Sequence, residues 1–205
     1  YKPSPLNGFD LFNYMALIVC ARSRDYAEIT FKAFADELEE NLKNGVYAFK
    51  GNEKTRITWE GIAVWPHLGH TFKSLKNLNS IMTGSAYPGL WDLHYDANDE
   101  SLHSMAEAYT RIYINTCLEN KVNVLLDIVE GGQCDGVVYH LNRSCKLMSF
   151  LNVETAEIVK DKTGVPYVSF DGDQTDPRSF SPAQFDTRVQ ALVEMMEQQI
   201  SEKAE

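Results

Sequence analysis

Apolar residues recur along this chain with two different spacings, and the spacing changes several times. A spacing of three or four residues is typical of helices and covers the segments 69–79, 101–116, 122–132, 146–163 and 181 onward. Short stretches in which apolar and β-branched residues cluster are typical of strands and occupy residues 56–65, 80–87, 134–141 and 165–173. From about residue 51 onward, the pattern therefore predicts strands that alternate with helices.

The first 50 residues have a different pattern and are predicted to form a helical segment that packs on the core. Asn7 is the expected N-cap of a first helix that is apolar on most faces, as buried helices are. A second helix is expected at about residues 25–44, and Gly45 follows it where a C-terminal cap belongs. The apolar stripe of this second helix consists of Phe31, Phe34, Leu38 and Leu42.

The last helix has the clearest start signal in the sequence. Ser181 stands at the N-cap position, Pro182 at the first helical position, and Gln184 completes a capping box. The apolar stripe of this helix consists of Phe185, Val189, Leu192 and Met196. Such a stripe predicts that one face of the helix packs against the core.

Strands that alternate with helices indicate a mainly parallel sheet that helices cover on both faces. The predicted fold is α/β: residues 51–205 form a doubly wound, Rossmann-like or flavodoxin-like domain of about four strands, preceded by the helical segment 1–50. Sheets of this kind bind ligands at the carboxyl ends of their strands. The loops expected there are residues 60–69, 83–96, 140–146 and 171–181.

Composition and charge exclude several classes of protein. The chain has 205 residues and a net charge of −10, which disfavours a nucleic-acid-binding protein, because phosphate contacts need clustered Lys and Arg. The most apolar run, residues 15–21, is too short to cross a bilayer, and no segment resembles a signal peptide. Four cysteines without a C-x-x-C pair suit a reducing compartment, so a cytoplasmic location is expected.

Nucleotide-binding motifs are missing from the predicted strand ends, since the sequence has neither G-x-G-x-x-G after a strand nor G-x-x-x-x-G-K-[ST]. The segment "YVSFDGDQTD" resembles the nucleophile motif of haloacid-dehalogenase-type phosphohydrolases, with Asp171 as nucleophile and Asp173 as general acid. Only one more helix follows this segment, so the later strands of that family have no counterpart. A turn-capping role around Pro177 is therefore the favoured interpretation of Asp173 and Asp176.

Cys145 is the most reactive candidate in these loops, because it stands between Arg143 and Lys146 at the predicted start of a helix. A helix dipole and two cations favour the thiolate over the thiol. A phosphatase-type C-x5-R loop is excluded by Leu151, and a redox pair with Cys134 by about 20 Å of intervening strand. Two interpretations stay open: one ligand of an iron–sulfur cluster, or a small, partly buried loop residue.

Two sequence blocks carry a resemblance to a known family. They are H-x-N-R-x-C-K at residues 140–146 and D-G-D-x-x-D-P-R-x-F-S at residues 171–181. With "NGFDLFNYMALIVCARS" and "ITWEGIAVW", they make nearly the whole chain similar to the 2-hydroxyacyl-CoA dehydratase and benzoyl-CoA reductase family. The similarity is closest to the carboxy-terminal domain of a dehydratase subunit.

The resemblance implies a subunit of an oxygen-sensitive enzyme of anaerobic metabolism. This enzyme is a lyase that dehydrates (R)-2-hydroxyacyl-CoA to enoyl-CoA by a ketyl-radical mechanism. The resemblance also implies a heterodimer with a second related subunit, a 4Fe-4S cluster, and a separate iron–sulfur activator protein that hydrolyses ATP and injects one electron. Two alternatives stay open, namely a benzoyl-CoA reductase-type subunit and a non-catalytic α/β binding domain.

The family's motifs also imply roles for individual residues, although they assign no catalytic residue. Cys145 matches a cluster ligand, and Asn142 and Arg143 match the residues beside it. Arg143 and Lys146 are expected to balance the charge of the cluster or to meet a phosphate of CoA. A structural or loop-ordering role is implied for the second block, which contains Asp173, Asp176 and Arg178.

The chain departs from the family in its other cysteines. The remaining cluster cysteines of the family lie in an amino-terminal domain, and Cys20, Cys117 and Cys134 do not match them. The chain also starts without an initiator methionine. We therefore expect a carboxy-terminal fragment that lacks the upstream cluster-binding domain and that alone neither holds a stable cluster nor is active. The expected partners are the second subunit, the activator and an acyl-CoA, with no nucleic acid and no membrane.

Overall fold

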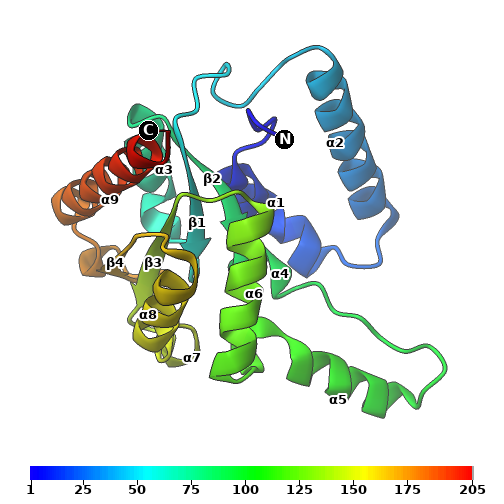
Figure 1. The fold of residues 1–205 in the computed structure, drawn as a ribbon. Helices are drawn as coiled ribbons and strands as arrows, with labels where there is room; N and C mark the ends of the chain where they lie inside the picture. The colour runs from blue at the N-terminus through cyan, green and yellow to red at the C-terminus, as the bar shows by residue number, and fades with distance from the viewer. Residues whose placement is uncertain (205) are drawn as a thin grey trace.

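The computed structural model describes residues 1–204, and within them the strands form one parallel sheet in the order β2-β1-β3-β4 (Figure 1). The strands are β1 Thr55–Glu60, β2 Ser80–Ser85, β3 Gly136–Asn142 and β4 Tyr167–Gly172. β1 is buried along its whole length and β3 along nearly all of it, because helices cover both faces of the parallel sheet. The predicted α/β fold with a parallel sheet of about four strands is confirmed.

Helices and short 3-10 turns connect the strands. The α-helices are α1 Gly8–Cys20, α2 Asp25–Lys43, α3 Leu68–Asn77, α4 Ala86–Gly89, α5 Ser101–Arg111, α6 Leu118–Gly131, α7 Lys146–Ser149, α8 Asn152–Thr163 and α9 Pro182–Ala204. The 3-10 turns are η1 Trp65–His67, η2 Tyr113–Asn115 and η3 Pro177–Ser179. Within residues 1–204, every helix is too short or too polar to cross a membrane.

Two buried apolar clusters show how the helices cover the sheet. One cluster joins α1, α3 and α9 to the face that carries Trp59, and the other joins α6, α7 and α8 to the face that carries Tyr139. Trp59 is fully buried, and the rings of Phe9 and Phe170 meet it edge-on at centroid distances of 5.5 and 5.4 Å. Truncating a buried aromatic residue to alanine costs about 3–5 kcal/mol. Trp59 therefore packs α1 against the sheet and also contacts Phe170 of β4.

The strand order determines where the chain changes its direction across the sheet. After β1, α3 leads outward to β2, whereas the connection through α6 returns to β3 on the other side of β1. The switch point therefore lies between β1 and β3. In doubly wound sheets, ligands bind in the crevice outside the carboxyl ends of the strands at this point.

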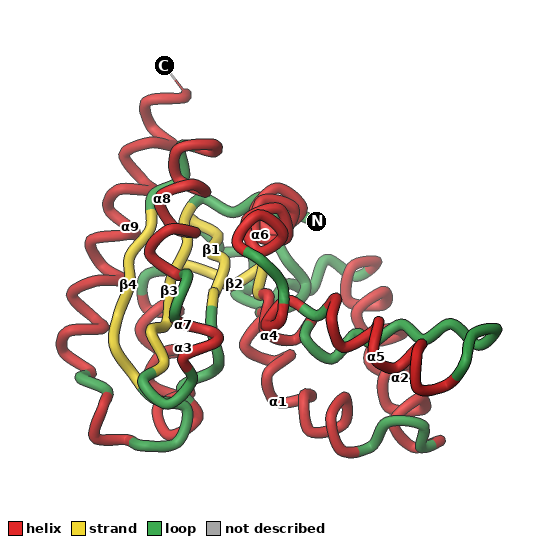
Figure 2. Tube along the Cα trace, turned by 90° about the horizontal axis from the view of Figure 1, so that it is seen from below, coloured by secondary structure: helices red, strands yellow, loops and turns green. Residues whose placement is uncertain are grey.

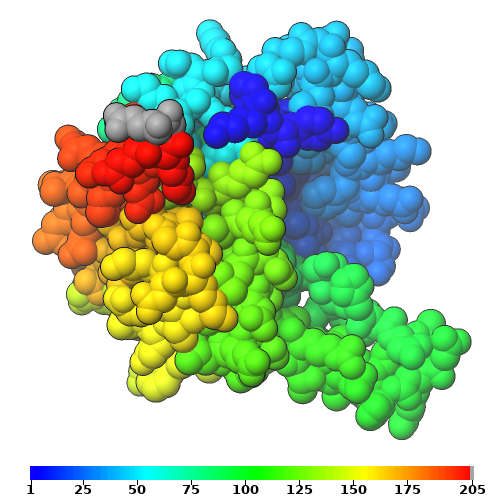
Figure 3. All heavy atoms as spheres, viewed as in Figure 1, coloured from blue at the N-terminus to red at the C-terminus, as the bar shows by residue number. Residues whose placement is uncertain are grey.

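Helices α2 and α5 lie at the periphery, away from the sheet, in both backbone views (Figure 1 and Figure 2). The predicted apolar stripe of α2 is only half-buried, and Ala27 is the buried residue of this helix. The ring of Tyr14 in α1 lies 4.6 Å from that of Phe34, which attaches α2 to α1. In the space-filling view, the segment around α5 projects from the body of the molecule (Figure 3). Neither helix contributes much to the core.

Two helix ends differ from the prediction. Asn7 occupies the N-cap position of α1, but its side chain makes no capping bond, and both of its amide atoms are buried without a partner among the described residues. The helix predicted at residues 101–116 ends at Arg111, because Ile112 is extended, with φ −67° and ψ 145°. The 3-10 turn η2 follows in place of the last helical turn.

The long helix predicted after β3 is broken into α7 and α8. In an unbroken helix, the carbonyl of Leu147 would accept a hydrogen bond from the N–H of Leu151. Instead, it accepts one from the ammonium of Lys121 at 3.1 Å, and the hydroxyl of Ser149 donates to the carbonyl of Asn142 at 3.0 Å. These bonds hold α7 against α6 and the end of β3, so the chain turns before α8 begins.

A buried ion pair attaches the amino-terminal segment to the end of the sheet where β1 begins. The guanidinium of Arg56 lies 2.7 Å from the carboxylate of Glu53, and the two side chains are 3% and 2% exposed. Glu53 also accepts a bond from the N–H of Ser4 at 2.7 Å. Arg56 donates to the carbonyls of Tyr1 and Gly132 at 2.5 and 3.2 Å. The pair thus joins the start of the chain, β1 and the end of α6.

Replacing Glu53 by Gln should destabilise the chain strongly. The charge of Arg56 would stay buried without its partner, which is expected to lower the free energy of unfolding by about 3–5 kcal/mol. Glu197→Gln is the matched control, because Glu197 pairs with Lys54 on the surface and such pairs contribute at most about 1 kcal/mol. Urea denaturation followed by circular dichroism measures both variants. Equal midpoints would contradict the role of the buried pair.

Candidate functional site

The two sequence blocks meet at the carboxyl edge of the sheet, where β3 and β4 end. These strands pair in parallel, and Asn142 lies opposite Gly172. The pairing extends one residue further, since the N–H of Arg143 donates to the carbonyl of Gly172 at 3.0 Å. Residues from two separate parts of the sequence therefore form one surface.

Asn142 joins the loops that follow these two strands. It is 2% exposed, and its amide nitrogen donates to the side-chain oxygen of Gln174 at 3.2 Å. Its Oδ1 accepts bonds from the backbone N–H groups of Ser144 and Gln174, both at 3.3 Å. Asn142 therefore fixes the loop after β3 relative to the loop after β4.

Asp173 is a second residue that connects the two loops, and it is also only 2% exposed. Its carboxylate accepts bonds from the N–H groups of Thr175 and Asp176, both at 2.9 Å. It also accepts bonds from the hydroxyls of Thr175 and Ser144. The Ser144 hydroxyl and the two N–H groups hold the pKa of Asp173 well below its usual range. The carboxylate is therefore ionised and acts as an acceptor within the turn.

Asp176 and Arg178 pair with each other inside a single turn. Asp176 caps η3, and the guanidinium of Arg178 donates to its carboxylate at 2.7 and 2.9 Å. The hydrogen bonds from Arg178 lower the pKa of Asp176 to about 2. The side chain of Arg178 is 87% exposed, so this pair lies on the surface and stabilises the turn only weakly.

The cations beside Cys145 also lie on the surface. Arg143 lies 3.7 Å from Asp171, with both side chains more than half exposed, and Lys146 is exposed. Cys145 is half-buried, and its N–H donates to the carbonyl of Asn142 at 3.2 Å. Only the single turn α7 follows it, so the prediction of a long helix whose dipole acts on this thiol is wrong.

Exposed apolar side chains follow Cys145 along α7 and α8. They are Leu147, Phe150 and Val153, which are 62%, 79% and 64% exposed. Among residues 1–204, no three His, Cys, Asp or Glu side chains lie close enough together to hold a metal ion. Within the described residues, the Cys145 thiol is therefore not part of a complete metal-binding group, and exposed apolar side chains follow it.

The other three cysteines lie outside both motif blocks. Cys134 precedes β3 at the opposite end of the sheet, is buried, and accepts a bond from the hydroxyl of Thr58 at 3.1 Å. Burial raises the pKa of the Cys134 thiol, which makes it an unreactive core residue. Cys20 and Cys117 are exposed.

A tight contact closes the loop after β1 against β3. Gly61 adopts φ +108°, and a Cβ atom there would lie 2.7 Å from the carbonyl oxygen of His140, so only glycine fits. The ring of His140 bonds through Nδ1 to the carbonyl of Ile62 at 2.5 Å and stacks on Phe170. Burial lowers the pKa of His140. The histidine that opens the H-x-N-R-x-C-K motif is therefore a neutral core residue that connects the loop after β1 to the sheet.

A buried acid that the sequence reasoning missed stands at the end of β1. Glu60 is fully buried, and its Oε1 accepts a bond from the hydroxyl of Tyr113 at 2.7 Å. Burial raises the pKa of Glu60 to about 7, although the Tyr113 bond, the charge of Lys121 and the N–H of Gly61 all act to lower it. The sequence feature that could have identified Glu60 is the occurrence of an acidic residue at the carboxyl end of a predicted buried strand.

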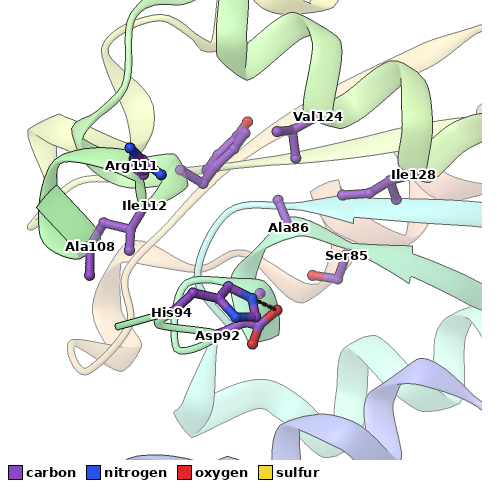
Figure 4. Close-up of a pocket in the computed structure, with 11 residues that line it drawn as sticks. Ser85, Ala86, Asp92, His94, Ala108, Arg111, Ile112, Val124 and Ile128 are labelled. Carbon is purple, nitrogen blue, oxygen red and sulfur yellow. Dashed lines mark ion pairs between the residues drawn. The ribbon is translucent and has the colours of Figure 1, made fainter. Parts of the chain in front are cut away.

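A cavity of about 440 Å³ opens near this acid, where β2 ends (Figure 4). Tyr113 forms part of its wall, so one side chain contacts both the cavity and Glu60. The wall is mostly apolar, and its polar side chains besides Tyr113 are Ser85, Asp92, His94 and Arg111. An apolar hollow of this size with a few polar groups is typical of sites that bind small molecules.

Nearly the whole chain matches the model of a known family. The family model for the D-component of 2-hydroxyglutaryl-CoA dehydratase matches residues 1–196. This chain belongs to that dehydratase family. The resemblance inferred from the two motif blocks is therefore confirmed.

Curated relatives with dehydratase names match 96% of the chain. It is 87% identical to the lactoyl-CoA dehydratase subunit alpha of Anaerotignum propionicum and 49% identical to the (R)-2-hydroxyisocaproyl-CoA dehydratase alpha subunit of Clostridioides difficile. It is 24% identical to a benzoyl-CoA reductase subunit of Thauera aromatica, over 98% of the chain. The matches cover 47%, 48% and 49% of these proteins, so the chain spans about half the length of the curated relatives it matches.

Asp173→Asn should loosen the two loops of this dehydratase-family domain. An amide accepts fewer bonds than a carboxylate and is neutral, so the loop after β3 would lose its link through Ser144. Asp176→Asn is the matched control, because its partner Arg178 is in the same turn. Limited proteolysis should cleave Asp173→Asn in these loops faster than either the control or the wild type. Equal cleavage rates for both variants would contradict this role of Asp173.

Glu60→Gln should change how stability depends on pH. The pKa of Glu60 rises from 4.5 to about 7 on folding, so between these pH values the folded state binds one more proton than the unfolded state. This residue should therefore lower the free energy of unfolding by about 3 kcal/mol as the pH rises through that window. Glutamine does not titrate and should remove the decrease. Urea denaturation at several pH values measures the difference between the two proteins; a pH-independent difference would contradict the assignment.

Proposed function

We propose that this chain is part of an alpha-type subunit of an (R)-2-hydroxyacyl-CoA dehydratase, a lyase that removes water from the acyl thioester to give the enoyl-CoA. The observation that carries the proposal is the meeting of the two family motifs at one edge of the sheet, with Cys145 half-exposed between them. The dehydratase relatives, which are 41–87% identical, support it. Lactoyl-CoA is the first substrate to test, because the relative with 87% identity bears that name.

The chemistry of Cys145 fits one ligand of a 4Fe-4S cluster. Such clusters are held by cysteine thiolates, and this thiol lies in a loop that Asn142 and Asp173 hold in place. In this proposal, the remaining ligands lie outside residues 1–204. When bound, the cluster would supply low-potential electron transfer to the thioester.

Arg143 and Lys146 are the cations that would face negative charge in the assembled enzyme, either on the cluster or on a phosphate of CoA. Both side chains are exposed. The 3.7 Å separation between Arg143 and Asp171 is longer than that of a strong ion pair, so the guanidinium is available to another anion. Leu147 and Phe150 would exclude water from the thiol once another protein surface covers them.

The proposed partners are a second related subunit, an acyl-CoA substrate, and an iron–sulfur activator protein that hydrolyses ATP. The word subunit in the names of the relatives supports the first of these. ATP would enter only through the activator.

A benzoyl-CoA reductase-type subunit is the less favoured alternative. The identity to such a protein is 24%, compared with 41% for the (R)-2-hydroxyglutaryl-CoA dehydratase subunit alpha of Acidaminococcus fermentans. A non-catalytic α/β binding domain is the third possibility, and it differs from the other two because it would bind no iron.

Cys145→Ser in the full-length subunit, purified without oxygen together with its partner, should lose cluster iron and the dehydration of lactoyl-CoA. Serine keeps the size of the side chain but removes the thiolate. Cys20→Ser and Cys117→Ser are the control variants, because these cysteines are exposed and lie outside both motif blocks, so both variants should keep both properties. Iron analysis, visible absorbance and chromatography of the CoA products measure the outcome.

Each result separates the candidate functions. Conversion of lactoyl-CoA to the enoyl-CoA supports a dehydratase, whereas turnover of an aromatic CoA alone supports the reductase. An iron-free wild type supports the binding domain. The 205-residue chain alone is expected to hold no stable cluster after anaerobic reconstitution with iron and sulfide. A cluster retained in Cys145→Ser would contradict the assignment of this ligand.

A further inference from the structure

We propose that Glu60 and Tyr113 form a proton relay to a ligand in the cavity at the end of β2. Tyr113 would touch the ligand, and Glu60 would be a positioning residue that acts through Tyr113. The identity of the ligand, an acyl thioester with a hydroxyl group next to its carbonyl, rests on the proposed function. Glu60 lies outside the two motif blocks, in the family-like segment 57–65, and stands at the switch point of the sheet.

The first support is a pair of buried polar groups on adjacent strands. Glu60 on β1 lies opposite Tyr139 on β3, so both side chains point to the same face of the sheet. They are 0% and 1% exposed. Within residues 1–204, neither Oε2 of Glu60 nor the hydroxyl of Tyr139 has a hydrogen-bond partner. Buried polar groups without partners are rare in native proteins and call for an explanation such as a functional role.

The second support is the set of charged and titratable groups around Glu60. Tyr113 reaches it from η2 through a hydrogen bond, and Tyr139 on β3 and Lys121 on α6 act on it through their charges or polar groups, while the backbone N–H of Gly61 also favours its ionised form. Burial outweighs these groups and places the pKa of Glu60 at about 7. Both protonation states are therefore accessible near neutral pH, as proton transfer requires. Burial and Glu60 raise the pKa of Tyr113, so its hydroxyl stays protonated except during transfer.

The third support is the position of Tyr113 between the acid and the cavity. Its hydroxyl bonds to Glu60, and its side chain also lines the cavity of about 440 Å³. Figure 4 shows apolar side chains on opposite sides of this space, among them Ala86, Val124 and Ile112. Such walls suit the carbon chain of a thioester, and Tyr113 is the wall residue that connects the cavity to a buried acid.

The proposed step conserves atoms and charge. As the carbon–oxygen bond of the substrate breaks, the hydroxyl of Tyr113 gives its proton to the departing oxygen, which leaves as water. Glu60 transfers its own proton to the oxygen of Tyr113 and becomes a carboxylate. The proton released from the neighbouring carbon then returns through Tyr113 to Glu60. The sum is one 2-hydroxyacyl-CoA converted to one enoyl-CoA and one water, with no net oxidation or reduction.

The test uses the full-length two-subunit enzyme with its activator and lactoyl-CoA. Glu60→Gln can still accept the bond from Tyr113 but cannot supply a proton, so kcat should fall about 100-fold with little change in KM. Wild-type kcat should decrease as the pH rises through about 7, whereas the residual activity of the variant should lack this decrease. Tyr113→Phe should lower kcat similarly. Glu130→Gln on the exposed side of α6 is the control and should match the wild type.

A second measurement is independent of catalysis and separates this inference from the proposed function. The infrared difference spectrum of wild type minus Glu60→Gln should contain a protonated-carboxyl band that disappears as the pH rises through about 7. Absence of this band at pH 6, or unchanged kcat and pH profile in Glu60→Gln, would overturn the relay. A wild-type enzyme that shows the band but dehydrates no 2-hydroxyacyl-CoA would overturn the proposed function and leave Glu60 as the proton-holding group.

Discussion

The parallel pairing of β3 with β1 and with β4 is the interaction on which the rest of the site depends. The ladder between β3 and β4 extends to their last residues, Asn142 and Gly172, so both loops start from one fixed line. Side chains alternate between the faces of a strand, and a register shift of one residue would turn His140 and Tyr139 to the wrong sides. His140 would then lose the carbonyl of Ile62, and the loop after β1 would lose its attachment to the sheet.

The two strand-end acids show how the same side-chain chemistry acquires different properties from its surroundings. Asp173 accepts bonds from N–H and hydroxyl groups, which stabilise its charge and lower its pKa. Glu60 accepts the bond of one tyrosine inside an apolar cluster, and burial raises its pKa to about 7. Pairs of acids whose surroundings separate their pKa values in this way have different roles in many enzymes. Here, one acid organises loops and the other is suited to exchange protons.

The order of strands and helices could be predicted from the sequence because short stretches that contain clustered apolar residues, such as 56–65 and 134–141, alternate with segments of helical spacing. The position of Cys145 at a strand end followed directly from that order. Features that depend on distant residues could not be predicted. The bond from Lys121 to Leu147 breaks a segment with helical spacing, and nothing in that segment indicates it. The properties of Glu60 depend equally on Tyr113, which belongs to another part of the chain.

Lys121 links the loop of Cys145 to the buried pair of Glu60 and Tyr113. Its ammonium lies 5.0 Å from the centre of the Tyr113 ring, contributes to the electrostatic field at Glu60, and holds the carbonyl of Leu147 two residues after Cys145. The position of the thiol loop and the charge of the buried acid are thus energetically coupled through one side chain, and any such coupling acts equally in both directions. The effects of substitutions at Cys145 and at Glu60 should consequently be non-additive, although the two residues lie on different strand ends.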